Sequence, residues 1–263
     1  MNQGHGANLR ALVYYTGAAI AAAVVCTLLL LTLPLPYRLR FRTGRLWTDF
    51  NLWMLRHVCG IRAEVRGREH IPAGPAIIMA KHQSAWETMA LQQVFPPQVW
   101  LLKRELLWIP LFGWGLWLLK SIAIDRSAGF RAMKALVRQG RDRLGRGIWV
   151  VVFPEGTRVA PDATRKYQPG GGLLAVDTGC PVVPVAHNAG LYWPRNSFAK
   201  RPGTIRMEIG PPIDPKGLSA TEVTERARDW IEASTRRLVE EARAADTTLA
   251  IGRNGTPVES GGS

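Results

Sequence analysis

The chain has few cysteines and few acidic residues. Only three of its 263 residues are cysteine (Cys26, Cys59 and Cys180), and their spacing fits neither a zinc site nor a disulfide framework. Asp and Glu number 20 against 34 Lys and Arg, which gives a formal net charge of +14. We therefore expect free thiols in a reducing compartment, and a partner that is negatively charged.

Nucleic-acid modules are also missing. The sequence has no zinc-finger spacing, no basic region followed by heptads and no aromatic RNA-binding motif, and its basic residues are spread along the chain. Tryptophan, in contrast, is abundant, with ten residues, several of them in apolar stretches that contain glycine. Indole favours the membrane–water interface. A lipid bilayer is therefore the expected partner and nucleic acid is not, with a tryptophan-rich core as the alternative.

Residues 11–33 form an uncharged stretch of 23 positions that ends at Pro34. About 20 apolar residues span a bilayer as a helix, and no Ala-x-Ala cleavage site follows. We predict a membrane helix, with an interfacial or re-entrant helix as the competing geometry. Arg10 precedes the stretch alone, whereas four arginines follow it: Arg38, Arg40, Arg42 and Arg45. The positive-inside rule then places the bulk of the protein on the cytoplasmic side of the inner membrane.

Alternating strand-like and helix-like segments begin at Ile61. The candidate strands are 61–66, 75–80, 98–103, 121–125, 148–153, 181–187 and 204–209. The candidate helices are 84–94, 129–144, 171–178 and 219–244, the last opened by the capping box Ser219-x-x-Glu222. This alternation predicts an α/β fold with a mixed, largely parallel sheet flanked by helices.

The expected organisation has three parts. Residues 1–60 contain the membrane helix, or a hairpin in which a Trp/Leu-rich helix over 46–59 folds back on it. Residues 61–246 form the α/β domain, and residues 247–263 a disordered tail. A further uncharged stretch, 106–119, is too short to span and is flanked by basic residues. It is predicted to touch the membrane interface, with a buried core segment as the alternative.

His82 and Glu87 offer a base and a carboxylate five residues apart. On one helix, that spacing separates the side chains by about 140°, so the two meet only if His82 precedes the helix. Ser84-x-x-Glu87 is a capping-box pattern, which predicts a helix that begins at Ser84. A neutral imidazole with a carboxylate partner can activate a hydroxyl. The alternative is a Glu87 that only caps the helix and a His82 that is an ordinary loop residue.

The segment Phe153-Pro154-Glu155-Gly156-Thr157-Arg158 follows an apolar, strand-like run. Gly156 allows a sharp turn, and Arg158 can bind phosphate in a bidentate manner. Glu155 either contributes to a ligand site or forms a local ion pair. A base together with an anion-binding segment indicates an enzyme that deprotonates a hydroxyl on a charged substrate.

Four blocks in fixed order resemble the glycerolipid acyltransferase family, and within it the bacterial 1-acyl-sn-glycerol-3-phosphate acyltransferases. They cover roughly residues 75–190. The blocks are His82 with Glu87; Lys103-Arg104-Glu105-Leu106 with Pro110, Gly113 and Ile124-Asp125-Arg126; Phe153 to Arg158; and Val183-Pro184-Val185. Two features depart from the family pattern. Glu87 stands where aspartate is usual, and no lysine directly precedes the glycines at 170–172, although Lys166 is nearby.

The resemblance implies transfer of an acyl chain from acyl-CoA or acyl-carrier protein to the sn-2 hydroxyl of 1-acylglycerol-3-phosphate. It implies no metal and no organic cofactor. The site residues it implies are His82 as base, Glu87 as its partner, and Glu155, Gly156, Thr157, Arg158, Lys103 and Arg126 as substrate contacts. Two alternatives remain: an acyltransferase for another lyso-lipid, such as lyso-ornithine lipid, and a non-catalytic basic membrane-binding protein of the same fold.

Overall fold

A computed structural model describes residues 3–110, 112–125 and 129–249 of the chain. Seven strands form one sheet in the order β1-β7-β6-β2-β5-β3-β4. Their bounds are β1 Ile61–Arg66, β2 Ile77–Ala80, β3 Gln98–Lys103, β4 Ile122–Ile124, β5 Trp149–Val152, β6 Val182–His187 and β7 Gly203–Ile209. Neighbouring strands pair in parallel except β6 and β7, which are antiparallel. The predicted mixed, largely parallel sheet is confirmed.

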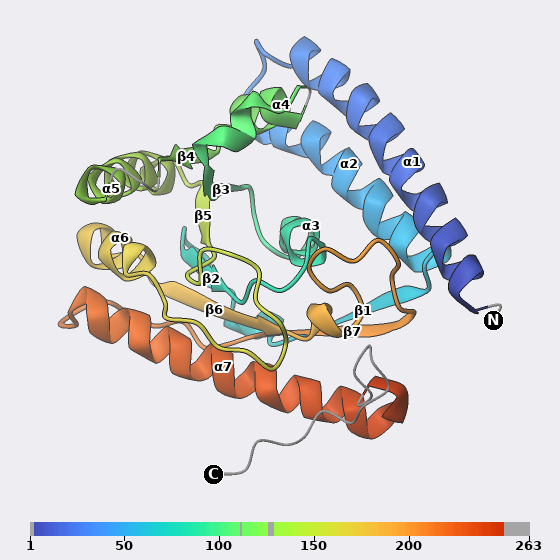
Figure 1. The fold of residues 1–263 in the computed structure, drawn as a ribbon. Helices are drawn as coiled ribbons and strands as arrows, with labels where there is room; N and C mark the ends of the chain where they lie inside the picture. Colours follow the sequence, from blue (N-terminus) through green and yellow to red (C-terminus); the bar gives the residue numbers. More distant parts are fainter. Residues whose placement is uncertain (1–2, 111, 126–128, 250–263) are drawn as a thin grey trace.

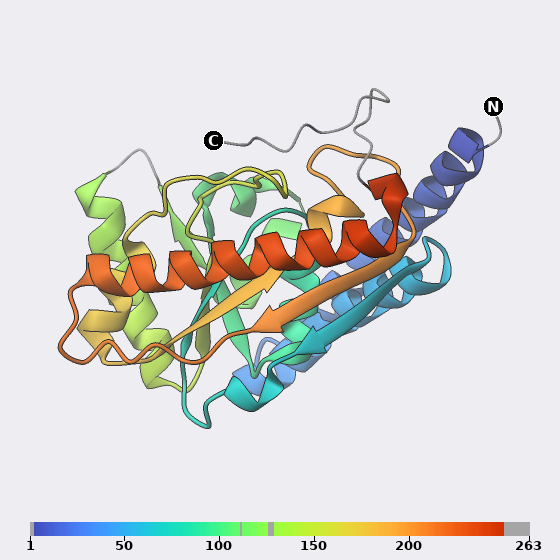
Figure 2. The ribbon, with the colours of Figure 1, turned by 90° about the horizontal axis from the view of Figure 1, so that it is seen from below.

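Helices cover both faces of the sheet (Figure 1). One face carries α5 (Phe130–Gly145), α6 (Gly170–Thr178) and α7 (Ala220–Ala245). The other carries α3 (Trp86–Val94) and a hairpin of α1 (Gln3–Leu31) and α2 (Tyr37–His57). Figure 1 and Figure 2 show α7 lying along the sheet, on the face away from the hairpin of α1 and α2. The predicted capping box forms, because Ser219 N–H donates to Glu222 at 2.7 Å and Glu222 N–H donates to Ser219 Oγ at 3.2 Å.

The central strands are apolar because both of their faces are covered. All residues of β2, β5 and β6 are buried, as expected for parallel strands between two helical layers. Along β2 the side chains alternate: Ile77 and Met79 pack in the cluster with α5, α6 and α7, and Ile78 and Ala80 pack in the cluster with the hairpin and α3. The carboxyl end of β2, where His82 follows, is therefore held between two packed layers.

The N-terminal hairpin is longer than the sequence pattern indicated. The helix expected over 46–59 is α2, which already begins at Tyr37, directly after Pro36. The four arginines that follow the apolar stretch lie within this helix, because arginine is a good helix former. The hairpin itself is confirmed: Trp47 Nε1–H donates to the Ala18 carbonyl at 3.1 Å. Its first helix contains the segment His5–Leu31, which is long and apolar enough to cross a membrane.

Smaller differences from the predicted elements lie at their ends. The strands, α3, α5, α6 and α7 agree with the predicted ranges to within two residues at each end. The stretch 106–119 contains a short helix, α4 (Phe112–Leu118), that the sequence pattern did not predict. The tail expected from residue 247 begins with a 3-10 turn, Thr247–Leu249, whose Leu249 packs into the core. Residues 250–263, the rest of that tail, lie outside the described residues.

Candidate active site

His82 and Glu87 contact each other at the carboxyl end of β2. The helix α3 begins at Trp86, two residues later than predicted, so His82 lies in the loop that enters it. His82 Nδ1 is 2.8 Å from Glu87 Oε1. The contact assigns the Nδ1 hydrogen to this bond and leaves the Nε2 lone pair of a neutral imidazole available. The ring also stacks on Phe153, with centroids 4.1 Å apart.

Glu87 is buried, and its carboxylate forms hydrogen bonds with three groups. Its Oε1 accepts from Gln83 N–H at 3.0 Å and from Ser84 N–H at 2.9 Å, in addition to His82. Only half of the expected capping box forms, because Ser84 Oγ accepts from Trp86 N–H at 3.3 Å rather than from Glu87 N–H. The two readings of Glu87 are therefore compatible: one carboxylate ties the loop to the helix and holds the imidazole.

The charge of Glu87 is maintained in the interior. Burial opposes ionisation, but the nearby His187 ring, the bond from His82 and the Ser84 N–H outweigh it and hold the pKa of the Glu87 carboxyl below its usual range. His187 accepts from Ala189 N–H through Nδ1, so its Nε2–H donates to the Lys81 carbonyl at 2.8 Å. Burial lowers the pKa of His187. His187 thus fixes the backbone directly before His82.

The segment 153–158 folds over the same loop. Gly156 adopts a left-handed φ of 70°, which the sharp turn after Glu155 requires. Glu155 Oε2 accepts from His82 N–H at 2.8 Å, and Val159 N–H donates to the His82 carbonyl at 2.7 Å. Glu155 is buried behind His82 rather than exposed to a ligand. Its carboxylate forms an ion pair with a lysine 74 positions away in the sequence, in place of the expected local pair with the neighbouring arginine.

The partner in that ion pair is Lys81, which the sequence analysis did not single out. Its Nζ lies 2.7 Å from Glu155 Oε1 and 2.8 Å from Glu232 Oε1 on α7, and its side chain is fully buried. Tyr167 OH donates to Glu232 at 2.9 Å. We call Lys81, Glu155, Glu232 and Tyr167 the Lys81 cluster. Its signal in the sequence is a lysine that directly continues an apolar strand, because a buried lysine needs carboxylate partners.

His82 lines a cavity of about 960 Å³. Its walls come from the α1–α2 hairpin, from the start of α3, from β3 to α4, and from the segments 156–158 and 193–198. Lys103, Thr157 and Arg158 line it together with His82, whereas the apolar part includes Val25, Leu29, Leu106 and Leu116. The structure therefore brings five predicted site residues to one cavity: His82, Lys103, Gly156, Thr157 and Arg158. Arg126 lies outside the described residues.

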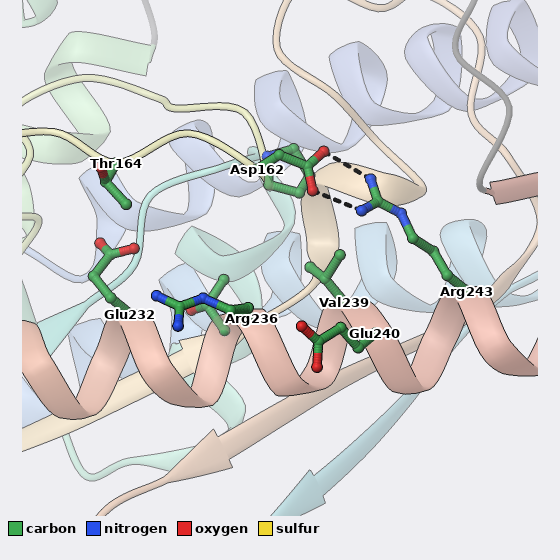
Figure 3. Close-up of a pocket in the computed structure, with 9 residues that line it drawn as sticks. Asp162, Thr164, Glu232, Arg236, Val239, Glu240 and Arg243 are labelled. Carbon is green, nitrogen blue, oxygen red and sulfur yellow. Dashed lines mark hydrogen bonds and ion pairs between the residues drawn. The ribbon is translucent and has the colours of Figure 1, made fainter. Parts of the chain in front are cut away.

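A second pocket, of about 210 Å³, lies away from His82 between α7 and the segment 161–164 (Figure 3). Arg243 spans it as a bidentate partner of Asp162, with both bonds at 2.7 Å. Glu232 lines this pocket and contacts Lys81 behind it. The larger cavity, which His82, Lys103 and Arg158 line, is the candidate active site.

Comparisons with known proteins agree with this geometry. Residues 62–188 match the acyltransferase family model. The chain is 46% identical over 228 residues to the 1-acyl-sn-glycerol-3-phosphate acyltransferase of Pseudomonas aeruginosa, covering 85% of this chain and 89% of that one. It is 31% identical over 172 residues to the corresponding alpha enzyme of Mus musculus, covering 64% and 60% of the two chains.

The fold agrees as well. The crystal structure of the 1-acyl-sn-glycerophosphate acyltransferase PlsC from Thermotoga maritima superposes with a TM-score of 0.72 at 25% identity, covering 90% of this chain and 95% of that one. The family model, the 46% identity to the Pseudomonas aeruginosa enzyme and the shared fold lead to one conclusion. This chain belongs to the glycerolipid acyltransferase family, which contains the 1-acyl-sn-glycerol-3-phosphate acyltransferases.

Proposed function

We propose that this protein moves a fatty acyl chain from an acyl thioester to the sn-2 hydroxyl of 1-acylglycerol-3-phosphate, giving phosphatidic acid. The observation that carries the proposal is the 2.8 Å contact between His82 Nδ1 and Glu87, made at the wall of a cavity that Arg158 also lines. The contact leaves Nε2 as a base beside a cation suited to phosphate. The similar enzymes of Pseudomonas aeruginosa and Mus musculus, both 1-acyl-sn-glycerol-3-phosphate acyltransferases by name, support the same assignment.

The reaction follows from this arrangement in one transfer. His82 Nε2 takes the proton of the sn-2 hydroxyl while the hydroxyl oxygen attacks the thioester carbonyl. Glu87 stabilises the imidazolium that forms. The tetrahedral intermediate then expels the thiolate, which takes the proton back from His82. The ester bond forms as the thioester bond breaks, and the enzyme is not acylated. The step uses acyl-CoA or acyl-carrier protein as co-substrate and no metal or organic cofactor.

The remaining site residues divide into two roles. Arg158 and Lys103 line the cavity and supply positive charge for the glycerol phosphate, with Gly156 and Thr157 as neighbouring contacts. Glu155 acts behind them, because its carboxylate holds the His82 backbone and Lys81. We therefore propose Glu155 as a positioning residue. The role of Arg126 in binding stays a prediction.

The acceptor is tested by assaying the purified protein in detergent with lysophosphatidic acid, monoacylglycerol and lyso-ornithine lipid. We expect kcat/KM for lysophosphatidic acid to exceed that for monoacylglycerol by roughly 10- to 100-fold, the worth of a charge-assisted phosphate contact. Running each acceptor with acyl-CoA and with acyl-carrier protein identifies the donor. A preference for either acceptor that lacks the phosphate contradicts the proposed acceptor.

The length of the Glu87 side chain provides a second test. Glu87→Asp shortens the carboxylate by one methylene but keeps its charge, so we expect it to retain substantial activity. Glu87→Gln cannot stabilise an imidazolium, and we expect kcat to fall at least ~10-fold below that of Glu87→Asp. Steady-state kinetics of the two variants measure this. Equal rates for both and for the wild type mean that Glu87 acts only as a helix cap.

We further propose that the protein binds the cytoplasmic side of the inner membrane through α1 and α4. The most apolar 18 residues of the segment His5–Leu31 have a mean hydropathy of 2.0, and only 22% of them are buried. Next to α1 lie three exposed indoles: Trp108, Trp114 and Trp117 are 76, 53 and 65% exposed. Gly115 on α4 lies close to Cys26 on α1, which joins the two surfaces (Figure 1).

The indoles are tested by vesicle co-sedimentation. Replacing Trp108, Trp114 and Trp117 together by serine removes three interfacial anchors, each worth up to about 2 kcal/mol of apolar transfer. We expect the variant to be extracted from phosphatidylglycerol vesicles at lower detergent or salt than the wild type. Trp53, exposed on α2, provides the matched control as Trp53→Ser. Identical extraction of the triple variant contradicts a membrane role for α4.

A further inference from the structure

Arg195 lies beside Arg158 at the cavity that contains His82. It is exposed, in the connection between β6 and β7, and it lines the cavity together with Arg158. Its Nη1–H donates to the Arg158 carbonyl at 3.4 Å. Two arginines that are 37 positions apart in the sequence are therefore joined by a contact from side chain to backbone where the segments 156–158 and 193–198 line the cavity, and Arg195 belongs to none of the four family blocks.

Neither guanidinium is neutralised. Within the described part of the chain, neither Arg158 nor Arg195 forms an ion pair with a carboxylate. Other exposed arginines do: Arg237 pairs with Glu208 at 2.7 Å and Arg243 pairs with Asp162 at 2.7 Å. Two adjacent cations without counter-ions repel each other, so their juxtaposition at a cavity favours an anionic ligand between them.

The segment that presents Arg195 is anchored rather than loose. Asn196 turns the chain with a left-handed φ of 61°, a conformation that asparagine tolerates. Phe198 stacks on Tyr15 of α1 at 5.2 Å. Lys200 is buried among aromatic rings, with Nζ 3.8 Å from the Tyr15 centroid and 4.5 Å from Trp193. These cation–π contacts hold the segment against α1 before any ligand binds.

We propose that Arg195 is a substrate-binding residue, and that with Arg158 it clamps a phosphate monoester at this end of the cavity. A phosphate monoester carries a charge of about −1.5 to −2 at pH 7, which two guanidiniums match and one does not. Each guanidinium presents paired N–H groups to phosphate oxygens. The ligand we expect first is the headgroup phosphate of the lysophospholipid acceptor, and this choice of ligand rests on the proposed function.

The test compares Arg195→Ala and Arg195→Lys with Arg62→Ala in the full chain. Arg62 is exposed on β1 and does not line the cavity, so its removal costs the same net charge elsewhere. With lysophosphatidic acid as acceptor, we expect Arg195→Ala to raise KM by roughly 10- to 100-fold. The KM of Arg195→Lys should lie between those of the wild type and Arg195→Ala. Turnover of monoacylglycerol should be unchanged in both Arg195 variants. Arg62→Ala should match the wild type.

Two further arms separate the sources of phosphate. In the first arm, acyl-CoA and acyl-pantetheine, which lacks phosphate, are titrated into wild type and Arg195→Ala at a fixed acceptor concentration. If Arg195→Ala raises KM for acyl-CoA but not for acyl-pantetheine, the clamp binds the phosphate of the donor. Binding of dodecyl phosphate, which has no hydroxyl to acylate, is measured by calorimetry in neutral detergent, so the clamp is testable even if the proposed acceptor is wrong. Unchanged dodecyl phosphate affinity in Arg195→Ala overturns the proposal, and so does an equal loss of turnover on both acceptors that persists with acyl-pantetheine as the donor.

Discussion

Replacing His82 by alanine is expected to lower turnover by at least ~10²-fold, the usual contribution of a general base. The variant keeps the cavity and its cations but has no group that can accept the hydroxyl proton at the position of Nε2. Glu87 stays satisfied, because it still accepts from Gln83 N–H and Ser84 N–H. The loss should therefore appear in kcat, with little change in acceptor KM.

Two controls make the His82 result decisive. His57 is exposed on α2 and stacks on Trp53 away from the cavity, so His57→Ala removes an imidazole without touching the site. The thermal midpoint of His82→Ala should lie close to that of the wild type, and its vesicle binding should be unchanged. Near-normal turnover in a folded His82→Ala protein removes the base assignment.

Replacing Lys81 by methionine is expected to have the largest effect on stability, a loss of about 3–5 kcal/mol of unfolding free energy. Methionine fills a similar volume, but the change leaves Glu155 and Glu232 together without their cation. Burial already raises the pKa of Glu155 in the native protein, and the ammonium of Lys81 offsets part of that rise. Without Lys81, a buried carboxylate must either stay charged and unpaired or take up a proton on folding.

The pH dependence of the Lys81→Met defect follows from that proton. A carboxyl whose folded pKa is raised is destabilising above its unfolded pKa, and the penalty disappears as the pH falls. The deficit should therefore be smaller at pH 5 than at pH 8 when urea unfolding is followed in detergent. Lys81→Met with Glu155→Gln should recover part of the stability at pH 8. Lys134→Met, at an exposed lysine on α5, is the matched control.

A Lys81→Met protein that loses less than about 1 kcal/mol at both pH values contradicts a structural role for the Lys81 cluster. The cluster also connects α7 with the loop of the base: Glu232 contacts Lys81, which contacts Glu155, which accepts from His82 N–H. We therefore expect Lys81→Met to lower turnover as well, through the position of His82 rather than through contact with substrate.

Much of the fold followed from local pattern. The seven strands and the helices of the α/β domain were predictable because buried parallel strands are continuous apolar runs and amphipathic helices repeat their apolar residues. The start of α2 was not predictable in this way, because a row of arginines reads equally as a loop flank or as the polar face of a helix. The short helix α4 was missed because glycine and proline interrupt its pattern.

The active site likewise combines features that the sequence pattern predicts with contacts that it does not. By itself, the sequence was enough to propose a base, its carboxylate partner and an arginine for phosphate binding, because their spacing and block order are properties of the chain. Only the tertiary structure decided that Glu155 lies behind His82 rather than beside the substrate, that Lys81 is its buried partner, and that Arg195 joins Arg158. These contacts join residues from 37 to 74 positions apart, and such pairs are set by which strands and helices pack together, which no local pattern records.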